Sequence, residues 1–120
     1  MSRKKKNKFF LHLLALMKES HIEYEKYIQN GKKFIYSKKI RSVNQNMYDL
    51  LKSNMAVDDL ELSVIIVDLI EHLEQWIWMW ENKKKVLSPD NNDIFFFSGY
   101  KKFPKNFENI LISYIEKKSE

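Results

Sequence analysis

The sequence predicts an all-α protein, a compact bundle of about four helices, three long and one shorter, with a long aromatic loop before the last helix. Two observations predict this class. The 120 residues include only two glycines and two prolines, too few for the many turns of a β-protein. Apolar residues also recur every three or four positions over long stretches, which is the period of an α-helix. A chain of this length can bury its own core, so we expect residues 1–120 to form a single helical domain.

The first helix is predicted over residues 8–29, where apolar side chains share one broad face. Asn30 and Gly31 mark its end, because glycine readily adopts the left-handed conformation that closes a helix. The basic residues before it, 1–7, are expected to form a flexible tail. This start resembles a secretory signal, but His12 interrupts the apolar run and no cleavage site follows it, so we expect no signal peptide.

The second helix is predicted over residues 32–54, where apolar residues repeat as a stripe like that of a coiled coil. The third is predicted over residues 59–84, and its apolar residues fill so broad an arc that we expect it to be the core helix. Asp58 and Glu61 stand three residues apart at its start. This spacing is typical of a capping pair, so we expect both side chains to cap the third helix.

The helical period stops after the lysines at 83–85. Pro89 and the aspartates and asparagines that follow it mark a turn. The next residues, 94–103, are rich in aromatic side chains and predict a strand-like or irregular segment. Pro104 suits the first position of a helix, so the last helix is predicted from there to about residue 118.

Three tryptophans, Trp76, Trp78 and Trp80, alternate along the third predicted helix. Because helical residues four apart share a face, Trp76 and Trp80 join the core, whereas Trp78 turns to the opposite side. Two alternatives remain open for Trp78. Either the last helix or the aromatic loop covers it, or another protein binds it.

A protein-binding surface is therefore expected on the outer side of the third helix and in the aromatic loop. The loop holds more aromatic side chains than one end of a bundle usually buries. The candidate partner-binding residues are Trp78, Val64, Val67, Glu71 and Glu74 in the helix, and Phe95, Phe96, Phe97 and Tyr100 in the loop.

Charge is distributed unevenly along the chain, whose formal net charge is +5 at pH 7. No lysine or arginine occurs between Ser53 and Asn82, where seven acidic residues lie. Basic residues cluster elsewhere, and they form a phosphate-binding surface if the clusters converge in space; otherwise they only keep the surface hydrated. With nineteen lysines and two arginines, any such contact is expected to be independent of base sequence. The candidate nucleic-acid-binding residues are Arg3, Lys4, Lys5, Lys6, Lys32, Lys33, Lys38, Lys39, Arg41, Lys83, Lys84 and Lys85.

Catalysis is not expected. Without cysteine, the chain has no disulfide, thiolate metal ligand or cysteine nucleophile. The three histidines lack metal-ligand spacing, and neither arginine has a histidine at the interval that small helical ribonucleases commonly use. We expect His72 to be a hydrogen-bonded residue at the edge of the core, with Asp68 as the candidate partner. No catalytic residue, metal or cofactor is therefore predicted.

These features predict a non-enzymatic helical interaction protein, an adaptor, inhibitor or small subunit that docks on a larger protein or nucleoprotein complex. The alternative is a small subunit that binds DNA or RNA through its lysines regardless of sequence, and self-association also stays open. No apolar run approaches the roughly 20 residues needed to cross a bilayer, so a cytoplasmic location is expected. The bias toward lysine, asparagine and isoleucine is typical of AT-rich coding sequence and suggests a bacterial or phage setting, such as defence or counter-defence.

Overall fold

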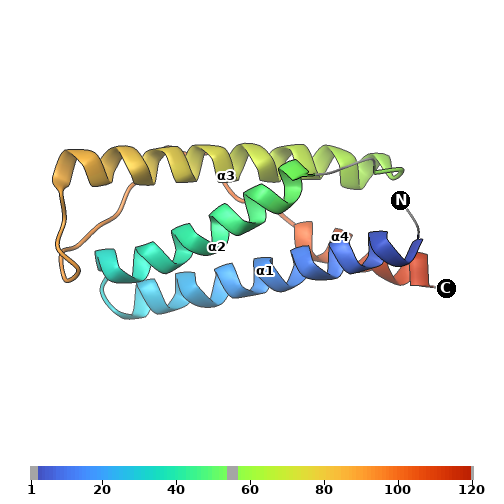
Figure 1. Cartoon of the computed structure of the whole chain (residues 1–120), viewed down its shortest axis with the longest axis horizontal. Coiled ribbons are helices and arrows are strands. Elements are labelled where there is room, and N and C mark those ends of the chain that lie inside the picture. Colours follow the sequence, from blue (N-terminus) through green and yellow to red (C-terminus); the bar gives the residue numbers. More distant parts are fainter. Residues whose placement is uncertain (1–2, 54–56, 120) are drawn as a thin grey trace.

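The computed structural model describes the backbone of residues 3–53 and 57–119 and the side chains of residues 8–53 and 57–117. These residues form four helices and no strand, so the prediction of an all-α bundle with three long helices and one shorter one is confirmed (Figure 1). The helices are α1 (Arg3–Gln29), α2 (Phe34–Ser53), α3 (Leu60–Leu87) and α4 (Phe107–Ser119).

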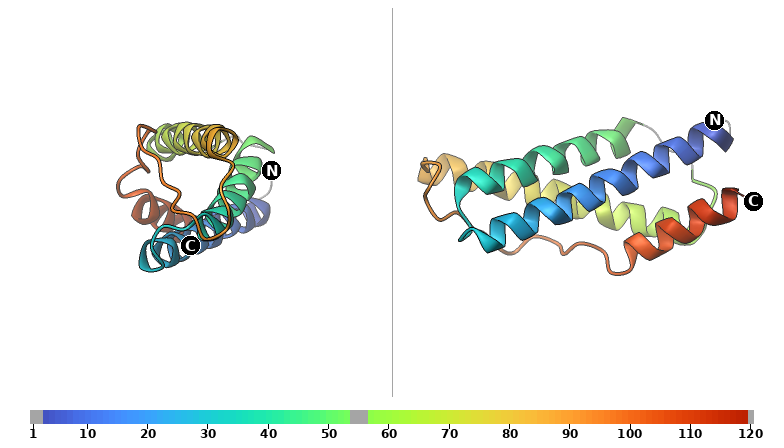
Figure 2. Two further views of the ribbon diagram at one scale, coloured as in Figure 1. Left: turned by 90° about the vertical axis from the view of Figure 1, so that its left-hand side faces the viewer. Right: turned by 90° about the horizontal axis from the view of Figure 1, so that it is seen from below.

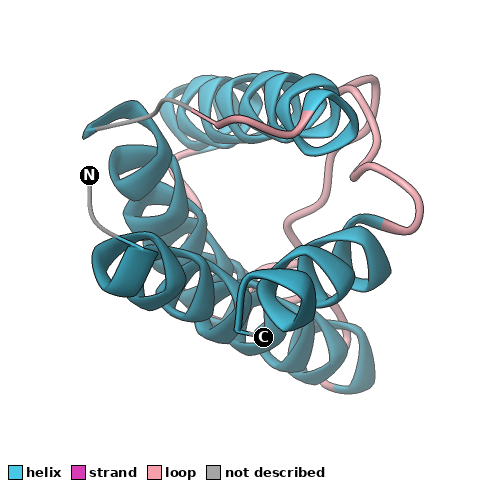
Figure 3. Ribbon diagram, turned by 90° about the vertical axis from the view of Figure 1, so that its right-hand side faces the viewer, coloured by secondary structure: helices cyan, strands magenta, loops and turns pink. Residues whose placement is uncertain are grey.

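The helices form an elongated bundle with principal extents of 49 × 23 × 22 Å. α1 packs against α2 and α4, and α3 packs against the same two helices. α4 is short and covers only the end of the bundle where α1 begins (Figures 1 and 2). The segment between α3 and α4, residues 88–106, runs back along the part of the bundle that α4 leaves open. Figure 3, which looks along the bundle, shows the helices and this segment arranged around the core.

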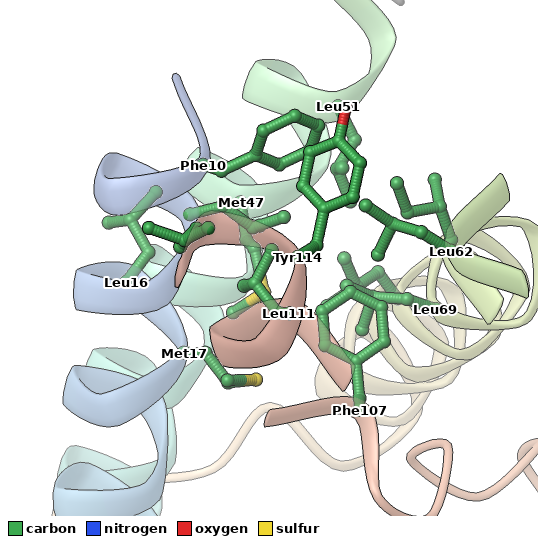
Figure 4. Packing of buried hydrophobic residues seen from close by; sticks show 14 of the residues in the cluster. Phe10, Leu16, Met17, Met47, Leu51, Leu62, Leu69, Phe107, Leu111 and Tyr114 are labelled. Atoms are coloured by element: carbon green, nitrogen blue, oxygen red, sulfur yellow. The ribbon is translucent and has the colours of Figure 1, made fainter. Parts of the chain in front are cut away.

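Buried apolar side chains form two clusters, one toward each end of the bundle. The larger cluster joins all four helices, and Met17, Met47, Leu69 and Leu111, one from each, are fully buried in it (Figure 4). The smaller cluster lies at the end that α4 does not reach. Its members are Tyr27, Phe34, Ile40, Trp76, Trp80 and Phe95. Because Phe95 belongs to the segment before α4, a loop residue completes the core where the fourth helix is missing.

Two helices extend further than predicted. The helical backbone of α1 begins at Arg3 rather than at residue 8. α3 continues to Leu87 rather than ending at residue 84, because lysines in its last turn stabilise the negative end of the helix dipole. Ser88 then ends α3 in the left-handed conformation, with φ 44°.

The other two helices are shorter than predicted. α2 spans Phe34–Ser53, within the expected range of 32–54. α4 begins at Phe107, so Pro104 precedes the helix instead of opening it. α4 starts later than predicted because Asn106, directly before it, adopts a positive φ of 63°, which an α-helix does not accommodate.

The start of α3 is capped differently from the predicted pair. Since α3 begins at Leu60, Asp59 occupies the capping position, and its Oδ1 accepts a hydrogen bond from the Leu62 N–H at 2.9 Å. Asp58 instead accepts a hydrogen bond from the Tyr114 hydroxyl at 2.7 Å. The predicted capping pair of Asp58 with Glu61 is therefore wrong, and Asp58 links α4 to the start of α3.

Candidate functional site

The outer face of α3 presents a line of exposed apolar side chains. Trp78 is 66% exposed, and Leu60, Val64 and Val67 are each more than half exposed. The alternative in which α4 or the aromatic loop covers Trp78 is therefore wrong for the part of the chain that the structure describes. α4 lies near the beginning of α3 (Figure 1), and the loop reaches only the edge of the outer face, where Gly99 lies near Trp78 and Lys101 contacts Glu71, so neither covers the Trp78 ring.

Intervals of four and three residues alternate along this outer line, and such intervals keep side chains on one face of a helix. The line, which we call the α3 ridge, consists of Leu60, Val64, Val67, Glu71, Glu74 and Trp78. All of these except Leu60 were predicted as partner-binding residues. Leu60 was not included in the sequence prediction. It lies four residues before Val64 and so continues the same spacing, which is the sequence signal that could have identified it.

The two glutamates of the α3 ridge contact neighbours from different elements. Glu71 Oε2 accepts a hydrogen bond from Lys101 Nζ at 2.6 Å, and Glu74 Oε1 accepts one from the Tyr48 hydroxyl at 2.9 Å. Lys101 Nζ also lies 2.9 Å from Asp68 Oδ1. Hydrogen bonds to Glu71 and Asp68 raise the pKa of Lys101 above its ordinary value, since they stabilise the charged ammonium. The α3 ridge is thus apolar at both ends and acidic in its middle.

A hollow of about 550 Å³ lies beside Trp78. The backbone N–H of Lys101 donates to Gln75 Oε1 at 2.6 Å, which holds the loop against this side of α3. The loop thereby supplies one wall of the hollow, and α3 supplies the other. The residues that line it are Glu74, Gln75, Trp78, Met79 and Gly99.

The prediction of Phe95 as a partner-binding residue is wrong. Phe95 is 0% exposed, because its ring packs between Phe34 and Trp80. Its N–H donates to the Lys32 carbonyl at 2.8 Å, and its carbonyl accepts a hydrogen bond from the Tyr27 hydroxyl. Burial raises the pKa of Tyr27 to about 12, so this hydroxyl remains a donor at neutral pH. Successive side chains in an extended segment point to opposite sides, and Phe96 is accordingly 55% exposed.

The other two loop candidates, Phe97 and Tyr100, are half-buried. The ring of Phe97 packs edge-on against Trp76, with centroids 5.2 Å apart, and Tyr100 packs on Phe97 at 5.6 Å. Burial also raises the pKa of Tyr100 above its ordinary value. Both rings therefore extend the smaller core cluster toward the surface.

Two of the predicted basic clusters converge at the end of the bundle where α2 begins and α3 ends. Lys32 Nζ and Lys83 Nζ lie 5.8 and 5.0 Å from the centre of the same ring, that of Phe96. Lys38 Nζ donates a hydrogen bond to Asn91 Oδ1 at 2.8 Å. Lysines from both clusters therefore contact the loop.

Arg41 and Lys84 approach a second aromatic ring at this end. Their cationic groups lie 5.6 and 5.4 Å from the centre of the Trp80 ring. Arg41 also forms an ion pair with Glu81, at 2.7 Å, which balances its charge. Any phosphate at this end would therefore be contacted mainly by lysines.

The remaining basic candidates differ in position. Lys39 and Lys85 are exposed near the same end, whereas Lys33 is half-buried, since its backbone bridges to Ile94. The N-terminal cluster lies at the opposite end of the bundle, where α1 begins (Figure 1). Its side chains, those of Arg3, Lys4, Lys5 and Lys6, lie outside the described residues.

A groove, which we call the α1–loop groove, separates α1 from the loop residues 96–103. It consists of two adjoining hollows of about 210 and 310 Å³. The two share four lining residues, Tyr24, Ile40, Trp76 and Tyr100. Sequence reasoning missed this groove, because its existence depends on α4 being too short to cover this part of α1.

His72 lies between the smaller core cluster and this groove. It is buried, and its Nδ1 lies 2.6 Å from the Lys101 carbonyl oxygen, so Nδ1 carries the proton that it donates. The expected bond to Asp68 is not formed, because Asp68 accepts from Lys101 Nζ instead. Burial lowers the pKa of His72, and the hydrogen bond to the carbonyl opposes that shift only in part.

The buried His72 is expected to make stability depend on pH. Because the pKa is lowered in the folded protein, the unfolded chain binds more protons at this residue just below the ordinary value of 6.5. The stability contributed by neutral His72 is fully present above pH 6.5 and is lost as the pH falls toward the lowered pKa. We expect His72→Gln to weaken the dependence of the free energy of unfolding on pH in this range, as measured by denaturant unfolding on both sides of pH 6.5. His12→Gln removes an exposed imidazole and is the control; an equal effect of both variants would contradict the assignment.

Comparison with protein-family models, curated proteins and solved structures finds no match for this chain. Within the described ranges, no group of three or more histidine, aspartate or glutamate residues is arranged to hold a metal ion. None of the helices described combines the length and apolarity needed to span a membrane. Function is therefore inferred from the surfaces of the molecule itself.

Proposed function

We propose that this protein is a non-enzymatic helical module that binds another protein through the α3 ridge, and that the bound segment of the partner is an amphipathic helix with basic flanks. The observation that carries the proposal is the 66% exposure of Trp78, in line with Val64 and Val67. Tryptophan is among the residues that contribute most to binding at interfaces. A line of large apolar side chains is also unfavourable in water, and a partner that covers the ridge removes that surface.

Two features support a helix as the bound element. Side chains of the α3 ridge alternate at intervals of four and three residues, the spacing at which the side chains of a second helix interdigitate. The hollow of about 550 Å³ beside Trp78 offers room for a large apolar side chain of such a helix.

Charge supports a basic partner. Glu71 and Glu74 lie in the middle of the ridge, and Lys101 pairs with Glu71 and with Asp68 beside it, so one ammonium group stands against three carboxylates. A helix with lysine or arginine beside its apolar positions therefore pairs favourably with these carboxylates. A second copy of α3 packed antiparallel would instead bring the glutamates of both copies together, and like charges oppose binding.

A synthetic amphipathic helix tests this proposal. The probe is a peptide with leucine at the positions that face the ridge and lysine at the flanking positions, and its counterpart carries glutamate in place of lysine. By isothermal titration calorimetry, we expect the lysine peptide to bind and the glutamate peptide to bind at least about tenfold more weakly. Trp78→Ala is expected to lower the affinity for the lysine peptide by at least about tenfold, because it removes the largest apolar anchor of the ridge.

Ile22→Ala is the matched control. Ile22 is also more than half exposed, but it lies on α1 and not on the ridge. This variant is expected to bind the lysine peptide as the unaltered protein does. Equal binding by the Trp78→Ala and Ile22→Ala variants, or no binding of the lysine peptide at all, would overturn the proposal.

A further inference from the structure

We propose that the α1–loop groove binds single-stranded nucleic acid, with a base stacked against its aromatic walls and the adjoining phosphates held by Lys32 and Lys83. This site goes beyond the proposed protein docking and occupies a different surface. The loop separates the two surfaces, because Gly99 borders the hollow beside Trp78 whereas Tyr100 borders the groove.

The walls of the groove are aromatic. Tyr24 stands on α1, Trp76 forms part of the floor from α3, and Phe97 and Tyr100 come from the loop. Phe96 lies at the edge of the same hollow and is 55% exposed. Flat rings at a surface bind the faces of bases, and only a single strand has unstacked bases to offer. A duplex, whose bases stay stacked inside, gains nothing from these rings.

Lysines stand at both ends of the groove. Lys32 lines the hollow of about 210 Å³, and Lys102 lines the hollow of about 310 Å³. Lys83 adds a third ammonium group, 5.0 Å from the centre of the Phe96 ring. No carboxylate among the described residues lines either hollow, in contrast to the acidic α3 ridge. A phosphate backbone that follows the groove therefore meets cations without facing a carboxylate in its lining.

The second hollow adds groups that hydrogen-bond to base edges. Asn44 is almost fully buried there, and its Oδ1 accepts a hydrogen bond from Ser20 Oγ at 2.9 Å. His72 also lines this hollow, and since its Nδ1 donates to the Lys101 carbonyl, its neutral ring keeps Nε2 as an acceptor. Groups of these kinds pair with the edges of unpaired bases, so the groove suits a base as well as a phosphate.

Fluorescence anisotropy with labelled oligothymidylate tests this assignment. We expect the single strand to bind, its affinity to fall steeply as salt rises, and the matched duplex and inorganic polyphosphate to bind at least about fivefold more weakly. Phe96→Leu is expected to weaken the single strand by at least about fivefold, because the stacking ring is lost. Phe96→Trp, which keeps a flat ring, is expected to retain or strengthen binding. Since Phe96 is exposed, both variants should keep the fold, which circular dichroism checks.

Charge variants separate this groove from a generally basic surface. Lys32→Gln combined with Lys83→Gln is expected to weaken oligothymidylate and to reduce the dependence of its affinity on salt. Lys18→Gln combined with Lys117→Gln removes the same charge, but neither of these exposed lysines lines the groove, so little change is expected.

Three results would each overturn the assignment. They are the absence of oligothymidylate binding at low salt, equal binding of polyphosphate and the single strand, and equal effects of the two double lysine variants. Trp78→Ala is expected to leave oligothymidylate binding unchanged, because Trp78 does not line the groove. Failure of the peptide experiment on the α3 ridge and failure of this one are therefore distinguishable.

Discussion

Alanine in place of Phe95 is expected to lower the free energy of unfolding by about 3–5 kcal/mol. The Phe95 side chain is 0% exposed, and the centre of its ring lies 5.0 Å from that of Phe34, 5.9 Å from that of Trp80 and 6.0 Å from that of Phe97. These neighbours belong to α2, α3 and the loop, so the substitution leaves a cavity where three elements meet. The loss of contacts and the cavity both oppose folding.

Phe96→Ala is the matched control, since it removes the same side chain one position further along. Phe96 is 55% exposed, so its loss is expected to change the free energy of unfolding by no more than about 0.5 kcal/mol. Denaturant unfolding followed by far-UV circular dichroism measures both variants. Equal losses at the two positions would contradict the alternation that points Phe95 inward and Phe96 outward.

The positions of Phe95 and Phe96 also show why the loop was not predictable from sequence. Three consecutive phenylalanines carry no pattern that distinguishes an inward from an outward side chain. The backbone of this segment is held by hydrogen bonds to a distant part of the chain, from Phe95 N–H to the Lys32 carbonyl at 2.8 Å and from Phe34 N–H to the Asp93 carbonyl at 2.8 Å. Such pairings between residues far apart in sequence leave no local signal.

Helical directions, in contrast, were predictable because they follow from the helical period alone. Trp76 and Trp80, one turn apart, were assigned to the core, and both are buried. Trp78 was assigned to the opposite side, and it is exposed. Whether anything covers Trp78 was not predictable, since that depends on where α4 lies. Its short length and its position at the other end of the bundle are tertiary features.

The convergence of the lysines follows from topology in the same way. Lys32 lies just before α2, and Lys83 lies near the end of α3, so they are far apart in sequence. α3 runs antiparallel to α2, which brings the beginning of one helix beside the end of the other (Figure 1). The two lysines then approach the same ring, that of Phe96. The sequence was enough to identify the lysine clusters. That two of them share one surface depends on how the helices are arranged in space.

Trp80→Ala is expected to lower the free energy of unfolding by about 3–5 kcal/mol, a loss as large as that at Phe95. Trp80 is 3% exposed, and its ring is stacked on Phe34 with centroids 5.6 Å apart. Its indole N–H donates to Ser37 Oγ at 3.0 Å, so alanine also removes a buried hydrogen bond. Trp80→Phe keeps a ring in the cluster and is expected to cost less. Denaturant midpoints and slopes measure both variants.

Trp78→Ala is the control for Trp80→Ala, because it removes the same side chain from the outer face of the same helix. We expect it to change the free energy of unfolding by no more than about 0.5 kcal/mol, since the side chain is 66% exposed. A loss at Trp78 comparable to that at Trp80 would mean that Trp78 supports the fold of this chain, and it would remove the basis for a partner-binding α3 ridge. If Trp80→Ala lowers the free energy of unfolding strongly and Trp78→Ala hardly changes it, Trp80 stabilises the bundle, whereas Trp78 is available to bind a partner.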